Sequence, residues 1–213
     1  MSLAESPLLL DGPCGPLEAM ALARPAATGL ALLCHPHPLF DGSMHNKVVS
    51  TLQRAARDAG YATLRFNFRG VGRSAGEYAE GEGEVDDAEV AARWLLEQHP
   101  GVPLTLLGFS FGSCVAAKLS GRLAQQGVAL KHLFMIAPPV ERFAVDGRLS
   151  DSVALTIIQP EADDVVTPEK VYAWSDSLAR PHELLKVAEC GHFFHGRLPD
   201  LKDLVLPRLQ SDA

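Results

Sequence analysis

The sequence predicts an α/β protein with a mostly parallel, twisted sheet covered by helices on both faces. Short apolar runs alternate along the chain with segments of helical pattern, which is typical of this fold class. No repeat or low-complexity linker interrupts the alternation. With 213 residues, 47% of them hydrophobic, the chain can fill one core, so we expect a single domain over residues 1–213.

The alternation assigns the elements in order. Seven short apolar runs are predicted strands: 17–23, 29–34, 61–66, 103–107, 132–136, 154–158 and 183–187. Five segments between and after them are predicted helices: 46–59, 85–98, 110–125, 168–178 and 198–209. Gly60 and Gly127 follow two of these helices, where a glycine commonly ends the last turn.

Charge and the N-terminus limit the partners. A net charge of -7 disfavours nucleic acid, because phosphate backbones are bound by clustered Lys and Arg. The acidic segment 77–89 is expected to be a solvated loop that leads into a helix. The N-terminus has neither a basic region nor a long apolar run, so we expect no membrane association and a cytoplasmic location.

The four cysteines stand far apart in the sequence and form no Cys-x-x-Cys pair. We therefore expect reduced, mostly buried thiols. Two histidine pairs, at 35/37 and 192/195, and His45 do not make a recognisable metal site, since no carboxylate or cysteine completes a ligand set. The glycines at 70, 72 and 76 miss the dinucleotide-binding fingerprint by one residue, so no cofactor is expected.

The segment from Leu104 to Leu119 has the pattern of a nucleophile elbow. An apolar strand runs into Gly108-Phe-Ser110-Phe-Gly112, and a helical pattern follows at once. The flanking glycines let strand and helix backbones approach closely, while the strained serine exposes its hydroxyl. A second Gly-x-Ser-x-Gly surrounds Ser74, but it lacks the strand before it and the helix after it. Context therefore favours Ser110 as a nucleophile.

Nearly the whole chain resembles the α/β-hydrolase superfamily, and within it the small bacterial serine hydrolases near the dienelactone-hydrolase and carboxylesterase group. Besides the elbow, the resemblance rests on His-Pro-His-Pro-Leu-Phe-Asp-Gly-Ser at 35–43 and Asn-Phe-Arg-Gly-Val-Gly-Arg-Ser at 67–74. Asn67 stands where the superfamily often has Asp. That loop usually supports structure, so the difference is not expected to affect catalysis.

The resemblance implies a Ser-His-Asp triad, in the chain order Ser, acid, His. His192, in a Gly-His pair after the last predicted strand, is the expected base, whereas His195 is expected at a helix start or on the surface. The family pattern places the acid at Asp163, and the adjacent Asp164 is then a turn residue. Asp163 would hold the imidazole of His192 in the tautomer that accepts the serine proton.

Acyl transfer also needs N–H donors for the developing oxyanion. Phe111 follows the nucleophile at a helix start, where backbone donors are free. The second donor is expected from the loop at 35–40, where the prolines leave His37, Leu39 and Phe40. Leu39 fits the family spacing best.

These residues predict cleavage of a small-molecule acyl substrate, an ester, through a Ser110 acyl-enzyme. A thioesterase or amidase would use the same triad, and a hydrolase-fold protein that only binds a ligand is the alternative of another class. Phe40, Phe109 and Phe193 stand beside the predicted site and are expected to contact an apolar or aromatic part of the substrate, unless they pack in the core. The sequence predicts neither the acyl group nor the oligomeric state.

Superfamily members that act at lipid surfaces commonly have lid helices inserted after the sixth strand of the sheet. Here only 17 residues, 137–153, separate two predicted strands, and they include two prolines. That is too short for a multi-helix cap, since one ordinary helix with its connections uses most of such a span. We therefore expect no lid, an open catalytic mouth and a preference for small, soluble esters.

Overall fold

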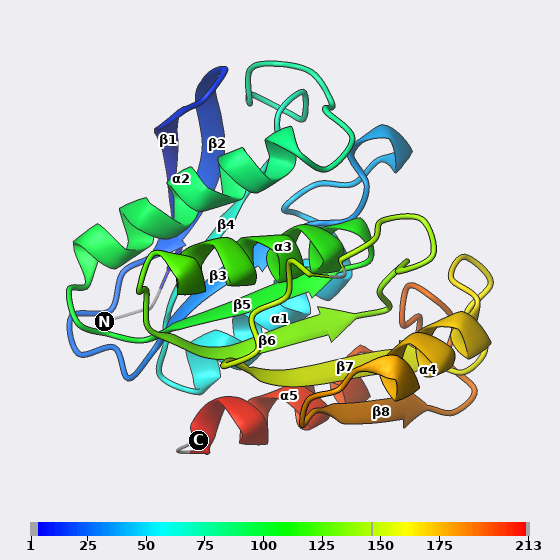
Figure 1. The fold of residues 1–213 in the computed structure, drawn as a ribbon. Helices are drawn as coiled ribbons and strands as arrows, with labels where there is room; N and C mark the ends of the chain where they lie inside the picture. The colour runs from blue at the N-terminus through cyan, green and yellow to red at the C-terminus, as the bar shows by residue number, and fades with distance from the viewer. Residues whose placement is uncertain (1–3, 146, 212–213) are drawn as a thin grey trace.

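The structure, a computed structural model, describes residues 4–145 and 147–211. Its centre is an eight-stranded sheet with the strand order β1-β2-β4-β3-β5-β6-β7-β8 (Figure 1). The strands are β1 (Ser6–Gly12), β2 (Gly15–Leu22), β3 (Leu30–Cys34), β4 (Ala62–Phe66), β5 (Leu104–Phe109), β6 (Leu130–Ile136), β7 (Ala154–Pro160) and β8 (Glu183–Val187). The helices are α1 (Lys47–Asp58), α2 (Gly83–Gln98), α3 (Phe111–Gln125), α4 (Pro168–Ser177) and α5 (Leu198–Gln210), with a short 3-10 turn η1 (Pro38–Phe40).

Strands β3 to β8 are parallel, and β2 joins them antiparallel to β4. This confirms the predicted mostly parallel sheet. The seven predicted strands and five predicted helices are all present, with ends that differ by a few residues.

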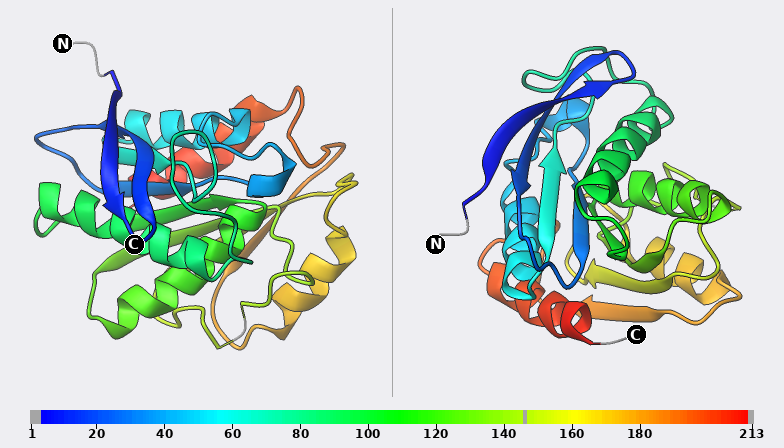
Figure 2. Two further views of the ribbon diagram at one scale, coloured as in Figure 1. Left: turned by 90° about the horizontal axis from the view of Figure 1, so that it is seen from above. Right: turned by 90° about the vertical axis from the view of Figure 1, so that its left-hand side faces the viewer.

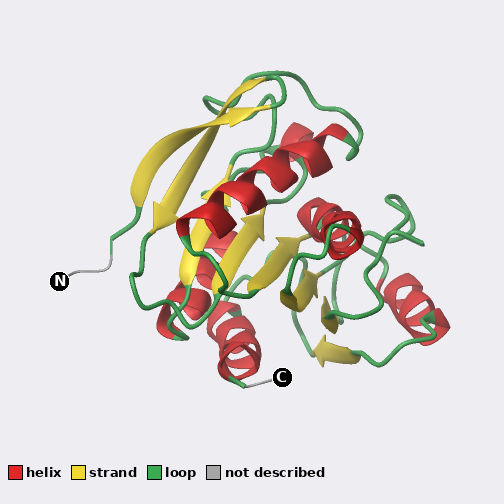
Figure 3. Ribbon diagram, turned by 60° about the vertical axis from the view of Figure 1, so that its left-hand side comes forward, coloured by secondary structure: helices red, strands yellow, loops and turns green. Residues whose placement is uncertain are grey.

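Strand β1 was not predicted. It pairs antiparallel with β2 and forms a hairpin at one edge of the sheet (Figures 2 and 3). Most of its side chains are exposed or half-buried, and only Leu10 is buried. In the sequence its three leucines, Leu8 to Leu10, form a run between Pro7 and Asp11 that is too short to mark a strand. Pairing with β2 forms the strand instead.

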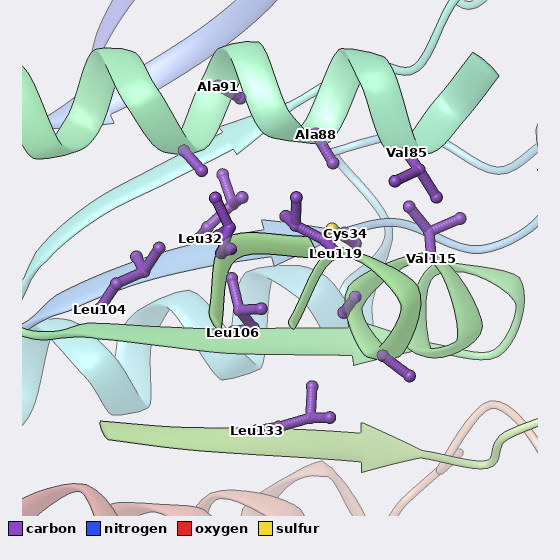
Figure 4. Close-up of a cluster of buried hydrophobic side chains, with 14 of the residues drawn as sticks. Leu32, Cys34, Val85, Ala88, Ala91, Leu104, Leu106, Val115, Leu119 and Leu133 are labelled. Carbon is purple, nitrogen blue, oxygen red and sulfur yellow. The ribbon is translucent and has the colours of Figure 1, made fainter. Parts of the chain in front are cut away.

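The helices cover both faces of the sheet. Leu104 and Leu106 of β5 pack in one core with α2 and α3 (Figure 4). Val171 of α4 belongs to the same core. Leu107 and Phe109 of β5 point to the opposite face and pack in a second core with α1 and α5. Because neighbouring strand residues point to opposite faces and both faces are buried, these strands are mostly apolar.

No helix is present between β6 and β7 in the described residues 137–145 and 147–153, which form turns and bends. The expected absence of a lid domain is confirmed. The carboxyl ends of β3, β5 and β7 meet at one edge of the sheet, where the loops that carry the predicted site residues begin. In open parallel sheets this edge is where ligands bind. Among the described residues, no helix combines the length and apolar character that crossing a membrane requires.

Candidate active site

Ser110 lies between β5 and α3 in a strained conformation, with φ 53 and ψ -125. A Cβ atom added to Gly108 would meet the carbonyl oxygen of Gly112 at 2.3 Å. A Cβ atom added to Gly112 would meet the carbonyl oxygens of Cys34 and His35 at 2.4 Å each. Both glycines are therefore required by close backbone approach, as the nucleophile-elbow pattern predicts.

Three predicted side chains, far apart in the sequence, are joined in a line. The Nε2 atom of His192 lies 3.0 Å from the Ser110 hydroxyl, and its Nδ1 lies 2.8 Å from Oδ2 of Asp163. An ionised carboxylate only accepts hydrogen bonds, so Nδ1–H donates to Asp163 and the unprotonated Nε2 accepts from the serine hydroxyl. This is the tautomer in which a histidine can take a proton from serine.

Asp163 is held as a carboxylate. Its Oδ1 accepts hydrogen bonds from the backbone N–H groups of Val165 and Val166, at 2.9 and 2.8 Å. Its Oδ2 accepts from His192 and from the side-chain amide of Gln159. Burial raises the pKa of Asp163, but the hydrogen bonds from His192, Val166 and Val165 outweigh burial, and the net pKa lies below its usual value. Gln159 was not identified as a site residue from the sequence. The signal that could have identified it is an amide side chain within the apolar run of β7, four residues before Asp163.

The alternatives considered from the sequence lie elsewhere. Asp164 and His195 are both exposed. Ser74 is buried and donates to the carbonyl oxygen of Asn67, while its hydroxyl accepts from the N–H of Glu18. Ser74 therefore ties β2 to the loop after β4, and no histidine is among its hydrogen-bond partners.

A cavity of about 310 Å³ opens beside Ser110 and His192. It is lined by His37, Phe40, Ser110, Phe111, Pro139, Arg142, Phe143, Val165, Val166, His192 and Phe193. The walls are mostly aromatic or aliphatic, which suits an apolar part of a ligand. Phe40 and Phe193 line the cavity, and their contact with a substrate stays a prediction. Arg142 and Phe143 were missed because the loop after β6 carries no motif that identifies them.

The structure corrects the expectation that Phe109 contacts substrate. Its side chain is completely buried on the α1/α5 face of the sheet and does not line the cavity. The ring instead packs against His192, with ring centroids 5.0 Å apart. Phe109 therefore supports the imidazole rather than the ligand, because consecutive residues at the end of β5 point in different directions.

The two predicted oxyanion donors differ in their present partners. Phe111 is the first residue of α3, where a helix leaves N–H groups without an acceptor in the helix. The N–H of Leu39 donates to Nδ1 of His37 at 3.2 Å, and the Leu39 side chain is exposed. Phe40 N–H donates to the His37 carbonyl. Leu39 thus stays a prediction, and it would have to share or release its bond to His37 to bind an oxyanion.

The loop after β4 and His35 support the site. Asn67, where the superfamily often has Asp, accepts from the N–H of Met44 and donates to Glu18, which is a structural role. His35 is fully buried: its Nδ1 bonds the carbonyl of Pro36, and its Nε2 accepts from the N–H of Phe68. Burial lowers the pKa of His35 to about 3, so the ring is neutral.

The cysteines are free thiols, of which only Cys14 is exposed. Burial raises the pKa of Cys34 and Cys114, the latter to about 12, so neither is a ready nucleophile. In the part of the chain that the structure describes, no three His, Cys, Asp or Glu side chains are grouped to hold a metal ion.

Comparison with known proteins places this chain in a family. A family model for the thioesterase domain matches residues 83–180. An uncharacterized protein of Rickettsia prowazekii is 35% identical over 185 residues, which cover 84% of this chain and 76% of that protein.

Two solved structures are similar over almost their whole length. An α/β serine hydrolase of Xanthomonas campestris, described as having no lid, has a TM-score of 0.90 and 36% identity, covering 99% of this chain and 95% of its own. An α/β serine hydrolase homologue from Coxiella burnetii has a TM-score of 0.87 and 37% identity, covering 98% and 99%. Since identity, fold and the extent of the match agree, the chain belongs to the lidless α/β serine hydrolases.

Proposed function

We propose that this protein hydrolyses small carboxylic esters through Ser110, His192 and Asp163. The observation that carries the proposal is the 3.0 Å contact between the Ser110 hydroxyl and Nε2 of His192, beside a cavity that can hold an acyl substrate. A serine hydroxyl attacks poorly until a base accepts its proton, and this contact supplies the base.

In the first half of the reaction, the Ser110 oxygen bonds to the ester carbonyl carbon while its proton passes to Nε2 of His192. Asp163, hydrogen-bonded to Nδ1, stabilises the imidazolium that forms. The N–H of Phe111, at the positive end of α3, is the donor proposed for the oxyanion. The carbon–oxygen bond to the alcohol then breaks, and the alcohol leaves with the proton from His192.

In the second half, a water molecule gives a proton to His192 as its oxygen attacks the acyl carbon. The bond to Ser110 breaks, the serine recovers its proton from His192, and the carboxylic acid leaves. Every proton that moves passes through one atom, Nε2 of His192. Ester hydrolysis by water changes no oxidation state, so the reaction needs no redox partner.

Thioester hydrolysis is a second candidate, favoured by the thioesterase family model that matches residues 83–180. The same steps apply, with a thiol as the leaving group. Rates on matched esters and thioesters distinguish the two candidates.

The test is labelling with a fluorophosphonate probe, followed by rates on matched esters, thioesters and amides of one acyl group. We expect labelling and ester cleavage in the wild type and in Ser74→Ala, and neither in Ser110→Ala. Labelling that survives in Ser110→Ala would move the nucleophile. An unlabelled wild type would favour a protein that only binds its ligand, and faster thioester cleavage would favour the second candidate.

A further inference from the structure

Arg142 is the one permanently charged side chain among the described residues that line the catalytic cavity. Among the described residues that line the cavity, none is a carboxylate, and apart from two histidines the rest are uncharged. The Arg142 side chain is exposed, so its guanidinium lies on the cavity wall where an entering ligand can reach it.

The arginine is held in place by the backbone. The N–H groups of Arg142 and Phe143 both donate to the carbonyl of Pro139, which forms a turn after β6. The guanidinium Nη2 donates to the carbonyl of Val165 at 2.9 Å. Val165 is part of the segment whose backbone binds Asp163, so Arg142 is anchored beside the triad.

The other guanidinium nitrogens of Arg142 are available. Nε and Nη1 make no hydrogen bond to any described residue, and no described carboxylate pairs with this arginine. In contrast, Arg69, Arg122 and Arg148 are all paired with carboxylates. Arg142 thus presents unused charged donors to a ligand that enters the cavity.

Because the whole protein is acidic, a cation in the cavity indicates that the ligand carries a negative charge. A net charge of -7 repels anionic substrates at long range, so an anion is accepted only where a local cation compensates for it. Hydrogen bonds between a guanidinium and a carboxylate are charge-assisted and stronger than neutral ones. One guanidinium balances one negative charge, which favours a carboxylate over a phosphate dianion.

We propose that Arg142 makes the Ser110 site selective for acyl substrates that carry a carboxylate group, such as the monoester of a dicarboxylic acid. This inference rests on the proposed hydrolase function and names its substrate class. Arg142 acts as a specificity residue, which binds the remote carboxylate while the triad acts on the ester.

The test compares two pairs of substrates, each with a carboxylate member and its neutral methyl ester. In the first pair, monomethyl adipate carries a carboxylate on the acyl half and dimethyl adipate is its neutral counterpart. In the second pair, 4-acetoxybenzoate carries the carboxylate on the alcohol half and methyl 4-acetoxybenzoate is its neutral counterpart. We expect kcat/KM of the wild type to favour the carboxylate member of at least one pair. In Arg142→Gln that preference should fall by about tenfold, as for loss of one partly exposed charged contact.

Two controls separate this effect from misfolding and from general charge. Arg73→Gln removes an exposed arginine that does not line the cavity, and it should keep the wild-type preference. Arg142→Lys should keep part of it. Added salt should weaken the preference in the wild type and have little effect on it in Arg142→Gln, because salt screens a partly exposed ion pair.

The outcomes distinguish the two proposals. Hydrolysis of the neutral esters with no preference that depends on Arg142 overturns the selectivity and leaves the hydrolase intact. A preference of equal size in Arg142→Gln does the same. Failure of the wild type to cleave any of the four esters or react with fluorophosphonate overturns both.

Discussion

The side-chain amide of Gln159 donates a hydrogen bond to Oδ2 of Asp163, 3.2 Å away, the same oxygen that accepts from His192. Gln159 is fully buried at the end of β7, and its Nε2 also bonds the carbonyl of Pro160. Its Oε1 has no hydrogen-bond partner among the described residues. If the amide were turned round, its Oε1 would face the carboxylate oxygen and repel it. The negative charge of Asp163 therefore determines the orientation in which Nε2 donates.

Replacement of Gln159 by Leu should change how the activity depends on pH. Loss of a donor raises the pKa of Asp163 and strengthens its bond to His192, so the acid limb of the kcat/KM profile should move to higher pH. The rate on the plateau should fall by roughly two- to tenfold, since a net hydrogen bond contributes about 1 kcal/mol. Gln53→Leu, at another buried glutamine that bonds Thr63, is the matched control. Equal effects of the two variants on the acid limb would show that Gln159 is merely structural.

Asp163→Asn should lower kcat by roughly three to four orders of magnitude, because an amide favours the wrong tautomer of the histidine. Asp164→Asn should have little effect, since that side chain is exposed. Steady-state kinetics on one activated ester measures both, and a reversed pair of effects would move the acid to Asp164.

Acid should destabilise the fold through His35 before it titrates the carboxylates. The pKa of His35 is lowered by burial to about 3, so in the window from about 6.5 down to 3 the unfolded chain binds a proton that the folded chain does not. Stability is therefore full above the unfolded value and decreases as pH falls, by at most about 1.4 kcal/mol per pH unit for this one group. His132, with a pKa lowered mainly by burial to about 4, acts in the same direction.

Urea unfolding between pH 7 and pH 5 measures this effect. We expect the free energy of unfolding to decrease, and His35→Gln to show a shallower dependence on pH from a lower starting stability. A free energy of unfolding that is constant over this range would contradict a neutral, buried His35.

The absence of a lid predicts how activity depends on chain length. In an open cavity of about 310 Å³ a long acyl chain stays partly in water, so each added methylene should improve binding by less than the roughly 0.8 kcal/mol of full burial. Rates on p-nitrophenyl esters from acetate to decanoate, below and above their aggregation limits, check this. Efficiency that rises steadily to long chains, or a jump in rate when the ester aggregates, would contradict it.

The fold and the elbow could be predicted from the sequence because their signals are local. The central strands are buried on both faces and are therefore mostly apolar, with β3 a continuous apolar run. Gly108 and Gly112 mark a backbone approach that only glycine permits. Strand β1 escaped prediction because its apolar run, Leu8 to Leu10, is too short and its pairing depends on β2.

The environment of the site depends on contacts that no local pattern encodes. Phe109 has the same apolar character as Phe193, but only the direction of its side chain from β5 shows that it packs under His192. Arg142 and Gln159 reach the site through long-range packing of β6 and β7. The roles of such residues follow from geometry and not from residue type.

Residues 163–166 serve two neighbours at once. Their backbone N–H groups bind the Asp163 carboxylate, and the Val165 carbonyl holds the guanidinium of Arg142. A shift of this segment that moved Arg142 would therefore also move the acid. Attempts to engineer a new substrate range should leave residues 163–166 intact. They should instead vary the loop that carries Arg142, residues 137–145. There the backbone bears no hydrogen bond to the triad among the described residues, so libraries can vary length and sequence without disturbing the proton relay.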